Sequence, residues 1–163
     1  MTTEQALFFE ACRRGDVQQV AHILQQDESL IYLTDSKGFT PLIIAVYNDQ
    51  PQVVEYLISK GADLDAQDFS GNTALMGVSF KGYKNIAELL LNAGADVNVT
   101  NANGATALTF AATFGHLAIA EMLLQRGADV NLRDVRGKSP LDHAIIQEND
   151  AMADLLEQFL DLK

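Results

Sequence analysis

Short runs of apolar residues with helical spacing recur along the chain and are separated by glycines. In residues 52–60, Val53, Val54 and Leu57 fall on one face of a helix, because residues three and four positions apart share a helical face. The same pattern predicts further helices over residues 84–93, 117–126 and 150–161. Three of the four are followed by a glycine, at Gly61, Gly94 and Gly127. Glycine readily takes the left-handed conformation that ends a helix, so these segments are predicted to be short amphipathic helices.

A second set of apolar segments precedes these helices, and each one begins after a hydroxyl-bearing residue. The hydroxyl residues are Thr40, Thr73, Thr106 and Ser139. A hydroxyl at this position can accept a hydrogen bond from a backbone N–H of the first turn and so cap the helix. Pro41 and Pro140 come next, at the first helical position, where the N–H that proline lacks would have no partner. Helices are therefore predicted over residues 41–48, 74–81, 107–114 and 140–147.

The whole pattern repeats with a fixed period, which the glycines show most clearly. Successive members of one set are 33 positions apart: Gly38, Gly71, Gly104 and Gly137. The segments DSKGFTPLIIAV, DFSGNTALMGVS, NANGATALTFAA and DVRGKSPLDHAI align around them without gaps. An Asp or Asn with a Gly three residues later suits a tight turn. Each unit is therefore predicted to be a turn followed by two helices.

Two motifs carry a resemblance to the ankyrin-repeat family over essentially the whole chain. That family has D-x-x-G-x-T-P-L early in its unit and L-L-x-x-G-A-D-V-N late, and this chain has DSKGFTPL, LLNAGADVN and LLQRGADVN. The resemblance implies an all-α ankyrin-repeat solenoid of five stacked helix-turn-helix units with β-hairpin or turn tips, as a single domain over residues 1–163. The units cover about 1–34, 35–67, 68–100, 101–133 and 134–163, and the first and last act as N- and C-terminal caps.

Several positions depart from the family pattern. The loop of the degenerate first unit is one residue longer than its counterparts. The family's histidine, three residues after the capping hydroxyl, is replaced by Ile43, Met76, Thr109 and Asp142, which predicts weaker hydrogen bonding between units. Asp49 and Glu148 stand where other units have glycine, which predicts a different turn there. Gly77 lies inside a short helix, where it either softens the stack, at a cost of about 1 kcal/mol relative to Ala, or permits close helix packing.

The acidic balance of the chain restricts its partners. Its 22 acidic and 11 basic residues give a net charge of −11, which repels nucleic-acid phosphates and anionic lipid headgroups. The acids are scattered, so their main effect is solubility. No apolar run is long enough for a membrane span and the first residues do not form a signal peptide, so a cytoplasmic monomer is expected. The single cysteine, Cys12, is expected to be a small core side chain.

The resemblance also indicates where a protein partner binds, because family members bind through a concave face of inner helices and hairpin tips. Five aromatic residues fall at positions of that face where repeat packing does not require apolar groups: Phe39, Tyr47, Phe69, Phe80 and Phe114. Exposed aromatics cost solubility unless they make a contact, and they are typical interface anchors. The hypothesis is an aromatic ladder that grips the partner, assisted by the basic residues Lys37, Lys81, Arg136, Lys138, Arg13 and Arg14. Alternatively, some of the rings fold back over the neighbouring unit.

A protein-binding scaffold without catalytic activity is therefore the expected function. His22, His116 and His143 occupy different positions of different units, so they are not expected to meet at one metal ion. Carboxylates such as Asp63 and Asp96 recur with the repeat, which favours a turn role over acid–base chemistry. No catalytic residue, metal or cofactor is therefore assigned.

Two alternative functions remain. The chain also resembles small stand-alone bacterial ankyrin proteins, some of which are linked to haem handling and catalase maturation. That resemblance implies a haem-binding face near His116, His143 or Tyr47 as one alternative. A structural spacer with an inert concave face is the other.

Overall fold

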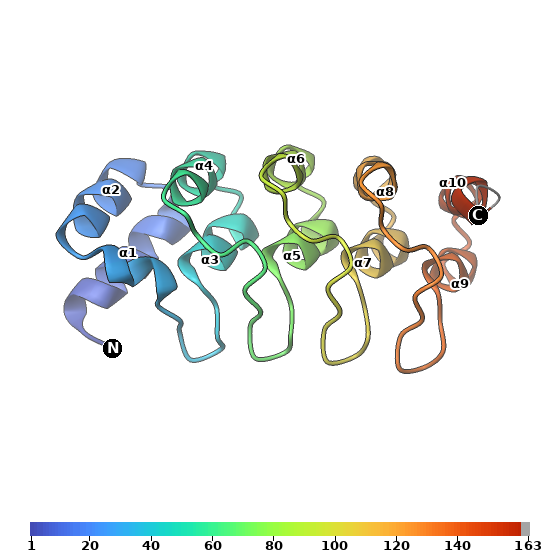
Figure 1. Ribbon diagram of the computed structural model, residues 1–163, viewed down its shortest axis with the longest axis horizontal. Helices are drawn as coiled ribbons and strands as arrows, with labels where there is room; N and C mark the ends of the chain where they lie inside the picture. The colour runs from blue at the N-terminus through green and yellow to red at the C-terminus, as the bar shows by residue number, and fades with distance from the viewer. Residues whose placement is uncertain (161–163) are drawn as a thin grey trace.

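Helices form two layers of the molecule, and loops project from one side of them. The computed structural model describes residues 1–160, which form ten α-helices and one 3₁₀ helix (Figure 1). The inner layer contains α1 (Thr3–Arg14), α3 (Pro41–Tyr47), α5 (Ala74–Lys81), α7 (Ala107–Phe114) and α9 (Pro140–Ile146). The outer layer contains α2 (Val17–Gln26), α4 (Pro51–Ser59), α6 (Lys84–Asn92), α8 (Leu117–Gln125) and α10 (Asp150–Leu160). The predicted all-α stack of helix pairs is confirmed, and residue 161 of the last predicted helix lies outside the described residues.

The inner helices begin where the hydroxyl residues predict. Each hydroxyl oxygen accepts a hydrogen bond of 3.1–3.2 Å from the N–H three residues later, in Thr40, Thr73, Thr106 and Ser139. Thr109 and Asp142 return this bond, because their side-chain oxygens accept from the N–H groups at the cap positions. Such reciprocal caps satisfy two donors that the helix itself leaves unpaired. Two of the positions that lack the family's histidine therefore still bind the backbone.

Each helix pair buries its apolar faces against the pairs on either side. In the inner layer, Leu42, Leu75 and Leu108 occupy equivalent positions and are almost fully buried. In the outer layer the equivalent buried residues are Val53, Ile86, Ile119 and Met152. Contacts join neighbouring inner helices, such as α3 with α5 and α5 with α7, and also the two helices of one unit, such as α3 with α4. Because every unit depends on its neighbours for burial, the stack is held by a series of equivalent interfaces.

The first unit closes one end of the stack with larger side chains. Phe8 and Phe9 of α1 are buried, and Cys12 is fully buried as expected. Burial raises the pKa of the Cys12 thiol to about 12, against the smaller opposite effect of the Arg13 charge, so the thiol stays protonated at neutral pH. The extra residue of this unit, which the sequence pattern assigned to the loop, lies in α2, which has ten residues where α4, α6 and α8 have nine. The loop after α2 contains the 3₁₀ helix η1 (Glu28–Tyr32), which the sequence pattern did not predict.

The loops that precede the inner helices form a row of hairpin-like turns. In the first, Asp35 Oδ1 accepts hydrogen bonds from the N–H groups of Lys37 and Phe39, and Gly38 is left-handed, with a φ of 80°. The same two bonds recur at Asp68, Asn101 and Asp134. One backbone hydrogen bond links each hairpin to the one before it, donated by Phe69, Ala102 and Val135. The part of the chain that the structure describes contains no β-strand, so the predicted tips are turns.

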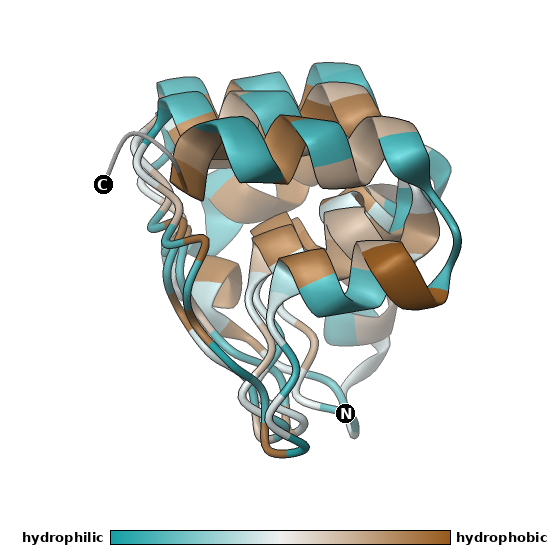
Figure 2. Cartoon of the chain, turned by 90° about the vertical axis from the view of Figure 1, so that its right-hand side faces the viewer, coloured by the Kyte–Doolittle hydropathy of each residue, from teal (hydrophilic) through white to brown (hydrophobic). Residues whose placement is uncertain are grey.

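The hairpins and the inner helices form two walls of an L-shaped cross-section. Viewed along the stack, the outer helices lie on top, the inner helices lie beneath them, and the hairpins project downward from one end of the inner helices (Figure 2). The underside of the inner helices and the adjoining side of the hairpins therefore make one continuous surface. We call this surface the concave face.

A second row of loops, which follows the outer helices, links the units by side-chain hydrogen bonds. Asp65 Oδ1 accepts from the N–H of Asp96 at 2.9 Å, and Asn98 Oδ1 accepts from the N–H of Asp129 at 2.8 Å. Within each loop a carboxylate accepts from the N–H two residues later, in Asp63, Asp96 and Asp129. The recurring carboxylates are turn residues, as predicted. The absent family histidine therefore does not leave the units without hydrogen bonds between them.

The turn between the two helices of a unit contains a left-handed residue whether or not that residue is glycine. Gly82 and Gly115 have φ angles of 86° and 76°, and Asp49 and Glu148 have 54° and 56° at the equivalent positions. The turns still differ as predicted, because α3 and α9 end one register position earlier than α5 and α7. The N–H groups of Asp49 and Glu148 accordingly bond the C=O three residues before them, whereas those of Gly82 and Gly115 bond the C=O four residues before. A residue with a side chain is disfavoured in this left-handed region by roughly 1–2 kcal/mol, so these two positions carry local strain.

Replacing Asn98 by Ala removes the two hydrogen bonds that its side chain makes to the next loop, with the N–H of Asp129 and the C=O of Gly127. We expect the free energy of unfolding to fall by about 1 kcal/mol, since the loop is exposed and water replaces part of the bonding. Asn103→Ala is the matched control, because the exposed side chain of Asn103 makes no hydrogen bond within residues 1–160. Urea denaturation measures both variants, and equal losses would contradict the linking role of Asn98.

Replacing Glu148 by Gly relieves its left-handed strain. We expect the free energy of unfolding to rise by on the order of 0.5 kcal/mol, because the strain relieved exceeds the extra entropy that glycine gives the unfolded chain. At the preceding residue, where φ is −81°, there is no such strain, and Gln147→Gly is expected to lower stability by about 0.5–1 kcal/mol. Thermal unfolding compares the two, and shifts in the same direction would argue against strain at Glu148.

Candidate partner-binding face

The five predicted aromatic residues form two pairs and a single ring rather than one continuous ladder. The rings of Phe39 and Tyr47 stack with their centroids 5.5 Å apart. Phe80 meets Phe114 edge to face, with a centroid distance of 4.7 Å and an interplanar angle of 81°. Phe69 stands at the tip of the next hairpin along from Phe39. The Phe80–Phe114 pair thus connects the third and fourth units, whereas the Phe39–Tyr47 pair lies within the second unit.

The Phe39–Tyr47 pair is half-buried and packed on its neighbours. Lys37 Nζ lies 5.9 Å from the centroid of Phe39, within the range of a cation–π contact. The Tyr47 ring lies over Gly77, where an added Cβ would come within 3.1 Å of Tyr47 Cζ. Gly77 therefore permits close packing, which was one of its two interpretations. Burial raises the pKa of the Tyr47 phenol, as does the nearby charge of Asp68, so the hydroxyl keeps its proton.

Phe69 is the most exposed of the five, with 76% of its surface accessible. One edge of its ring lies against Gly38 of the preceding hairpin, since a Cβ added at Gly38 would come within 2.7 Å of Phe69 Cδ1. The rest of the ring faces solvent. Phe69 therefore contacts the neighbouring unit along one edge, as the alternative interpretation proposed, but most of its ring stays exposed.

The Phe80–Phe114 pair stands over a hollow in the concave face. These two side chains are 41% and 49% exposed, at the C-terminal ends of α5 and α7. The hollow has a volume of about 220 Å³ and is lined by Tyr47, Asn72, Met76, Phe80, Phe110 and Phe114. Its lining is aromatic and apolar except for the amide of Asn72 and the hydroxyl of Tyr47. Such a surface suits the insertion of an apolar group with a polar group beside it.

Two residues of this lining were not anticipated from the sequence: Met76 and Phe110. Met76 and Phe110 lie at positions where apolar residues are expected to serve the core. One signal was available for Phe110, because it occupies the register position of Gly77 in the next unit. A phenylalanine next to a glycine in the neighbouring unit indicates an uneven surface. This signal does not identify the residues that line the hollow.

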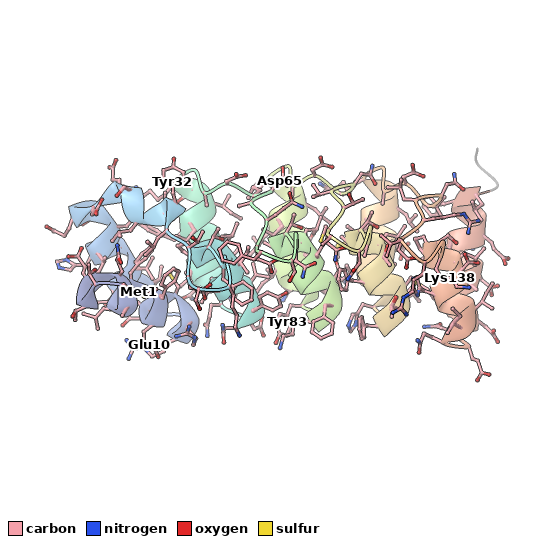
Figure 3. The ribbon with its side chains drawn as sticks, turned by 90° about the horizontal axis from the view of Figure 1, so that it is seen from below. Met1, Glu10, Tyr32, Asp65, Tyr83 and Lys138 are labelled. Atoms are coloured by element: carbon pink, nitrogen blue, oxygen red, sulfur yellow. The ribbon has the colours of Figure 1, made fainter. Side chains whose placement is uncertain are left out.

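The predicted cations fall into two groups. Arg13 and Arg14 form ion pairs inside the first unit, with Glu10 at 2.6 Å and with Asp16 at 3.8 Å. The other four are exposed and form no ion pair with any residue in the described range: Lys37, Lys81, Arg136 and Lys138. Lys138 belongs to the hairpin nearest the C-terminal end of the stack (Figure 3). The unpaired positive charges therefore lie on hairpins and at the end of α5.

The histidines are separated in space, and two of them are already hydrogen-bonded. His116 Nε2 lies 2.9 Å from the backbone oxygen of Phe80, and His143 Nε2 lies 2.8 Å from Oδ2 of Asp134. His22 is exposed on α2. Across residues 1–160 no three His, Cys, Asp or Glu side chains are placed to share a metal ion. In the same range, no helix has both the length and the apolar character for crossing a membrane.

A larger hollow, of about 260 Å³, lies away from the aromatic pairs, between α2, η1 and α4. Tyr32, which lines it, lies at the edge of the stack opposite Tyr83 when the molecule is seen from the hairpin side (Figure 3). Its lining includes the oppositely charged Glu28 and Lys60, so its charge favours neither sign of ligand. We therefore take the concave face as the candidate site although this hollow is larger.

The last hairpin is linked to its helix by a His–Asp contact that the other hairpins lack. His143 Nε2 lies 2.8 Å from Oδ2 of Asp134, whose side chain is 11% exposed and whose Oδ1 accepts from the N–H groups of Lys138 and Arg136. Burial acts to raise the pKa of Asp134, but these donors together hold it below its ordinary value. The equivalents of His143 in other units are Ile44, Gly77 and Phe110.

The family model described as ankyrin repeats (three copies) matches residues 8–101 and 75–162, which together cover most of the chain. Curated relatives share shorter stretches. One is ankyrin repeat and SAM domain-containing protein 6 of Danio rerio, 39% identical over 60 residues, which are 37% of this chain and 8% of that protein.

Two further relatives carry the names of enzymes. E3 ubiquitin-protein ligase KEG of Arabidopsis thaliana is 38% identical over 60 residues, which are 37% of this chain and 4% of that protein. NAD-capped RNA hydrolase NUDT12 of Homo sapiens is 37% identical over 56 residues, 34% of this chain and 12% of that protein. The chain thus spans only a small part of the length of these relatives.

Asp134→Asn tests the contact with His143. The variant keeps the turn, since Asn101 makes the same two backbone bonds, but it removes the carboxylate that faces His143 Nε2. We expect a loss on the order of 1 kcal/mol at pH 7. Because the pKa of Asp134 is lowered by folding, its contribution is present above the unfolded value of about 3.9 and is lost as the pH falls below it.

Denaturation curves between neutral and acid pH measure this difference, which should narrow below about pH 4. Asp35→Asn is the matched control, because Asp35 makes the two turn bonds and its unit has Ile44 where the last unit has His143. A gap between wild type and Asp134→Asn that is constant with pH would refute the role of the carboxylate charge.

Proposed function

Because the chain belongs to the ankyrin-repeat family, we propose that it is a non-catalytic module that binds a partner protein through its concave face and hairpin tips. Ankyrin repeats generally mediate protein–protein interaction. A stack of equivalent interfaces offers a partner a long, stiff surface whose side chains vary independently of the core. The proposal assigns recognition to those variable side chains.

The observation that carries this proposal is the exposure of the Phe80–Phe114 pair. Packing of the repeat does not demand an aromatic residue there, since the register position of Phe80 holds Thr113 in the next unit. Apolar surface of this size in contact with water is unfavourable. Fully burying an exposed side chain of this kind contributes roughly 1.5–3 kcal/mol, and covering one of these two half-exposed rings contributes about half of that. A bound partner provides that cover.

The reactive side chains support a non-catalytic function, because the fold already uses them. The carboxylates of both loop rows accept backbone N–H groups. The thiol of Cys12 is buried and protonated. A general base or nucleophile needs to be free to reach a substrate, and these groups are engaged in holding turns or filling the core.

The activities named for the relatives are not transferred to this chain. The ligase and the hydrolase share with it segments that make up 4% and 12% of their own lengths. Function has to be argued from the site rather than from a shared fold. What the chain has in common with these proteins is the repeat, and the repeat supports binding.

Affinity capture from a native lysate with quantitative mass spectrometry tests the proposal. The baits are the wild type, the double variant Phe80→Ala/Phe114→Ala and the single variant Tyr32→Ala. We expect at least one protein that the wild type retains and that the double variant loses by about tenfold or more, as for two interface anchors.

Tyr32→Ala is the matched control, because Tyr32 is 70% exposed and lies on the edge of the stack away from Tyr83. It should capture the same proteins as the wild type. Circular dichroism melts establish that all three baits are folded. If the double variant captures every protein at the wild-type level, binding through this face is refuted.

A further inference from the structure

We infer that the partner presents an acidic peptide segment with one bulky apolar side chain, which inserts into the hollow beneath Phe80 and Phe114. The carboxylates of the segment then meet the unpaired cations of the concave face. This inference rests on the proposed function and adds the chemistry of the partner to it.

The size and lining of the hollow indicate a side chain as its occupant. Its volume of about 220 Å³ is smaller than the roughly 300–1,000 Å³ of pockets that enclose small molecules. It corresponds to roughly seven water molecules at about 30 Å³ each. Aromatic rings line most of it, so a large apolar or aromatic side chain is the complementary group.

The walls of the hollow are already held in place before a partner arrives. Phe80 and Phe114 contact each other edge to face, and the Tyr47 ring rests on Gly77. His116 bonds the backbone oxygen of Phe80, which fixes the end of α5 against the next unit. Side chains ordered in this way lose little conformational entropy when a ligand binds, so less of the binding free energy is offset by ordering them.

The charge next to the hollow is positive. Lys81 ends α5 and Lys84 begins α6, and both are exposed. At the turn position between these helices the third and fourth units have glycine, whereas the second and fifth have the acidic Asp49 and Glu148. Lys84 lies at the N-terminus of α6, where the helix dipole disfavours a positive charge, so this lysine does not stabilise its own helix. A bound anionic ligand would interact favourably with its charge.

The hairpins extend this positive surface along the stack. Lys37, Arg136 and Lys138 are exposed, while the carboxylates of Asp35 and Asp134 accept backbone N–H groups. Arg136 and Lys138 lie two units beyond the unit that carries Phe80. The hairpins lead into the N-terminal ends of the inner helices, whereas Phe80 lies near the C-terminal end of α5. A peptide that reaches both crosses two helix-packing steps of about 10 Å and the length of an inner helix, about 12 Å. At least about seven residues of an extended peptide cover this distance, so carboxylates on both sides of the apolar side chain match the face.

The same features argue against a nucleic acid as the anion. Single strands stack their bases on flat aromatic platforms. Phe80 and Phe114 are turned 81° from each other and so present a hollow instead of a platform. The net charge of −11 also repels a polyanion at long range, whereas a short peptide with a few carboxylates is repelled far less.

Selection from a random peptide library, with peptides of about 16 residues that can span the face, tests the inference. The full chain is the immobilised target. We expect the enriched peptides to share one Trp, Phe, Leu or Met flanked by Asp and Glu. Their affinity, measured by fluorescence anisotropy, should weaken as the salt concentration is raised from about 0.05 to 0.5 M.

Two variants separate the apolar and the charged parts. Phe80→Ala/Phe114→Ala should abolish binding of the enriched peptides. Lys81→Gln/Lys84→Gln should weaken it about fivefold, because exposed charge pairs each contribute little. Lys60→Gln is the matched control, since Lys60 is an exposed lysine beside Tyr56 in the outer layer, and its affinity should equal that of the wild type. These lysines are on the surface, so their replacement leaves the stack folded.

The outcomes distinguish the inference from the function on which it rests. Enriched peptides that lose binding in the aromatic double variant but are basic or neutral would overturn the inference and leave the proposed function standing. Peptides that bind the double variant as well as the wild type, or an absence of enrichment, would overturn the inference, while the capture experiment decides the function separately. A random single-stranded DNA oligonucleotide that competes with the peptides at physiological salt would overturn it in favour of a nucleic acid.

Discussion

The stacking of units is the constraint on which the rest of the molecule depends. No helix pair can bury its apolar faces alone, so Leu42, Leu75 and Leu108 are covered only because a neighbour stands beside each of them. Stacking in a fixed register also brings the ends of successive inner helices next to one another. Phe80 and Phe114, which are far apart in the chain and one register position apart in the repeat, meet edge to face for this reason. The concave face is therefore a product of the same packing that stabilises the fold.

Carboxylates and cations lie close together in the hairpins. One carboxylate oxygen of each of Asp35, Asp68 and Asp134 accepts two backbone N–H groups, which holds the turn without removing the charge of the carboxylate. Lys37 and Lys138, in the same turns, form no ion pair within residues 1–160. The hairpins therefore offer exposed cations to a ligand although the net charge of the chain is −11. Net charge alone does not say which charged groups of this face a partner can reach.

Most helix boundaries could be predicted to within a residue because their signals are local. A hydroxyl cap, a proline at the first position and a closing glycine act through neighbouring backbone groups, so they work in any context. The different turn at Asp49 was predictable from the missing glycine, but its left-handed φ was not, because a residue with a side chain disfavours that geometry. The helix η1 was missed because its five residues are too few to show a helical period.

The candidate site was predictable only in outline. Register identified Phe80 and Phe114 as surface residues, but their contact depends on side-chain directions that the sequence does not give. The hollow and the role of Phe110 in it follow from three units packed together. The ion pairs that occupy Arg13 and Arg14 likewise depend on which acids lie within reach.

Gly77 shows how far the shape of this face can be altered without altering the stack. The position of the Tyr47 ring is set by the absence of a single methyl group, and a Cβ at Gly77 would press on that ring at about 3.1 Å rather than on any backbone atom. The leucines that hold neighbouring units together lie elsewhere and would be untouched. A substitution at this one position could thus change which partner side chains the face accepts during evolution, while the packing of the units stays the same.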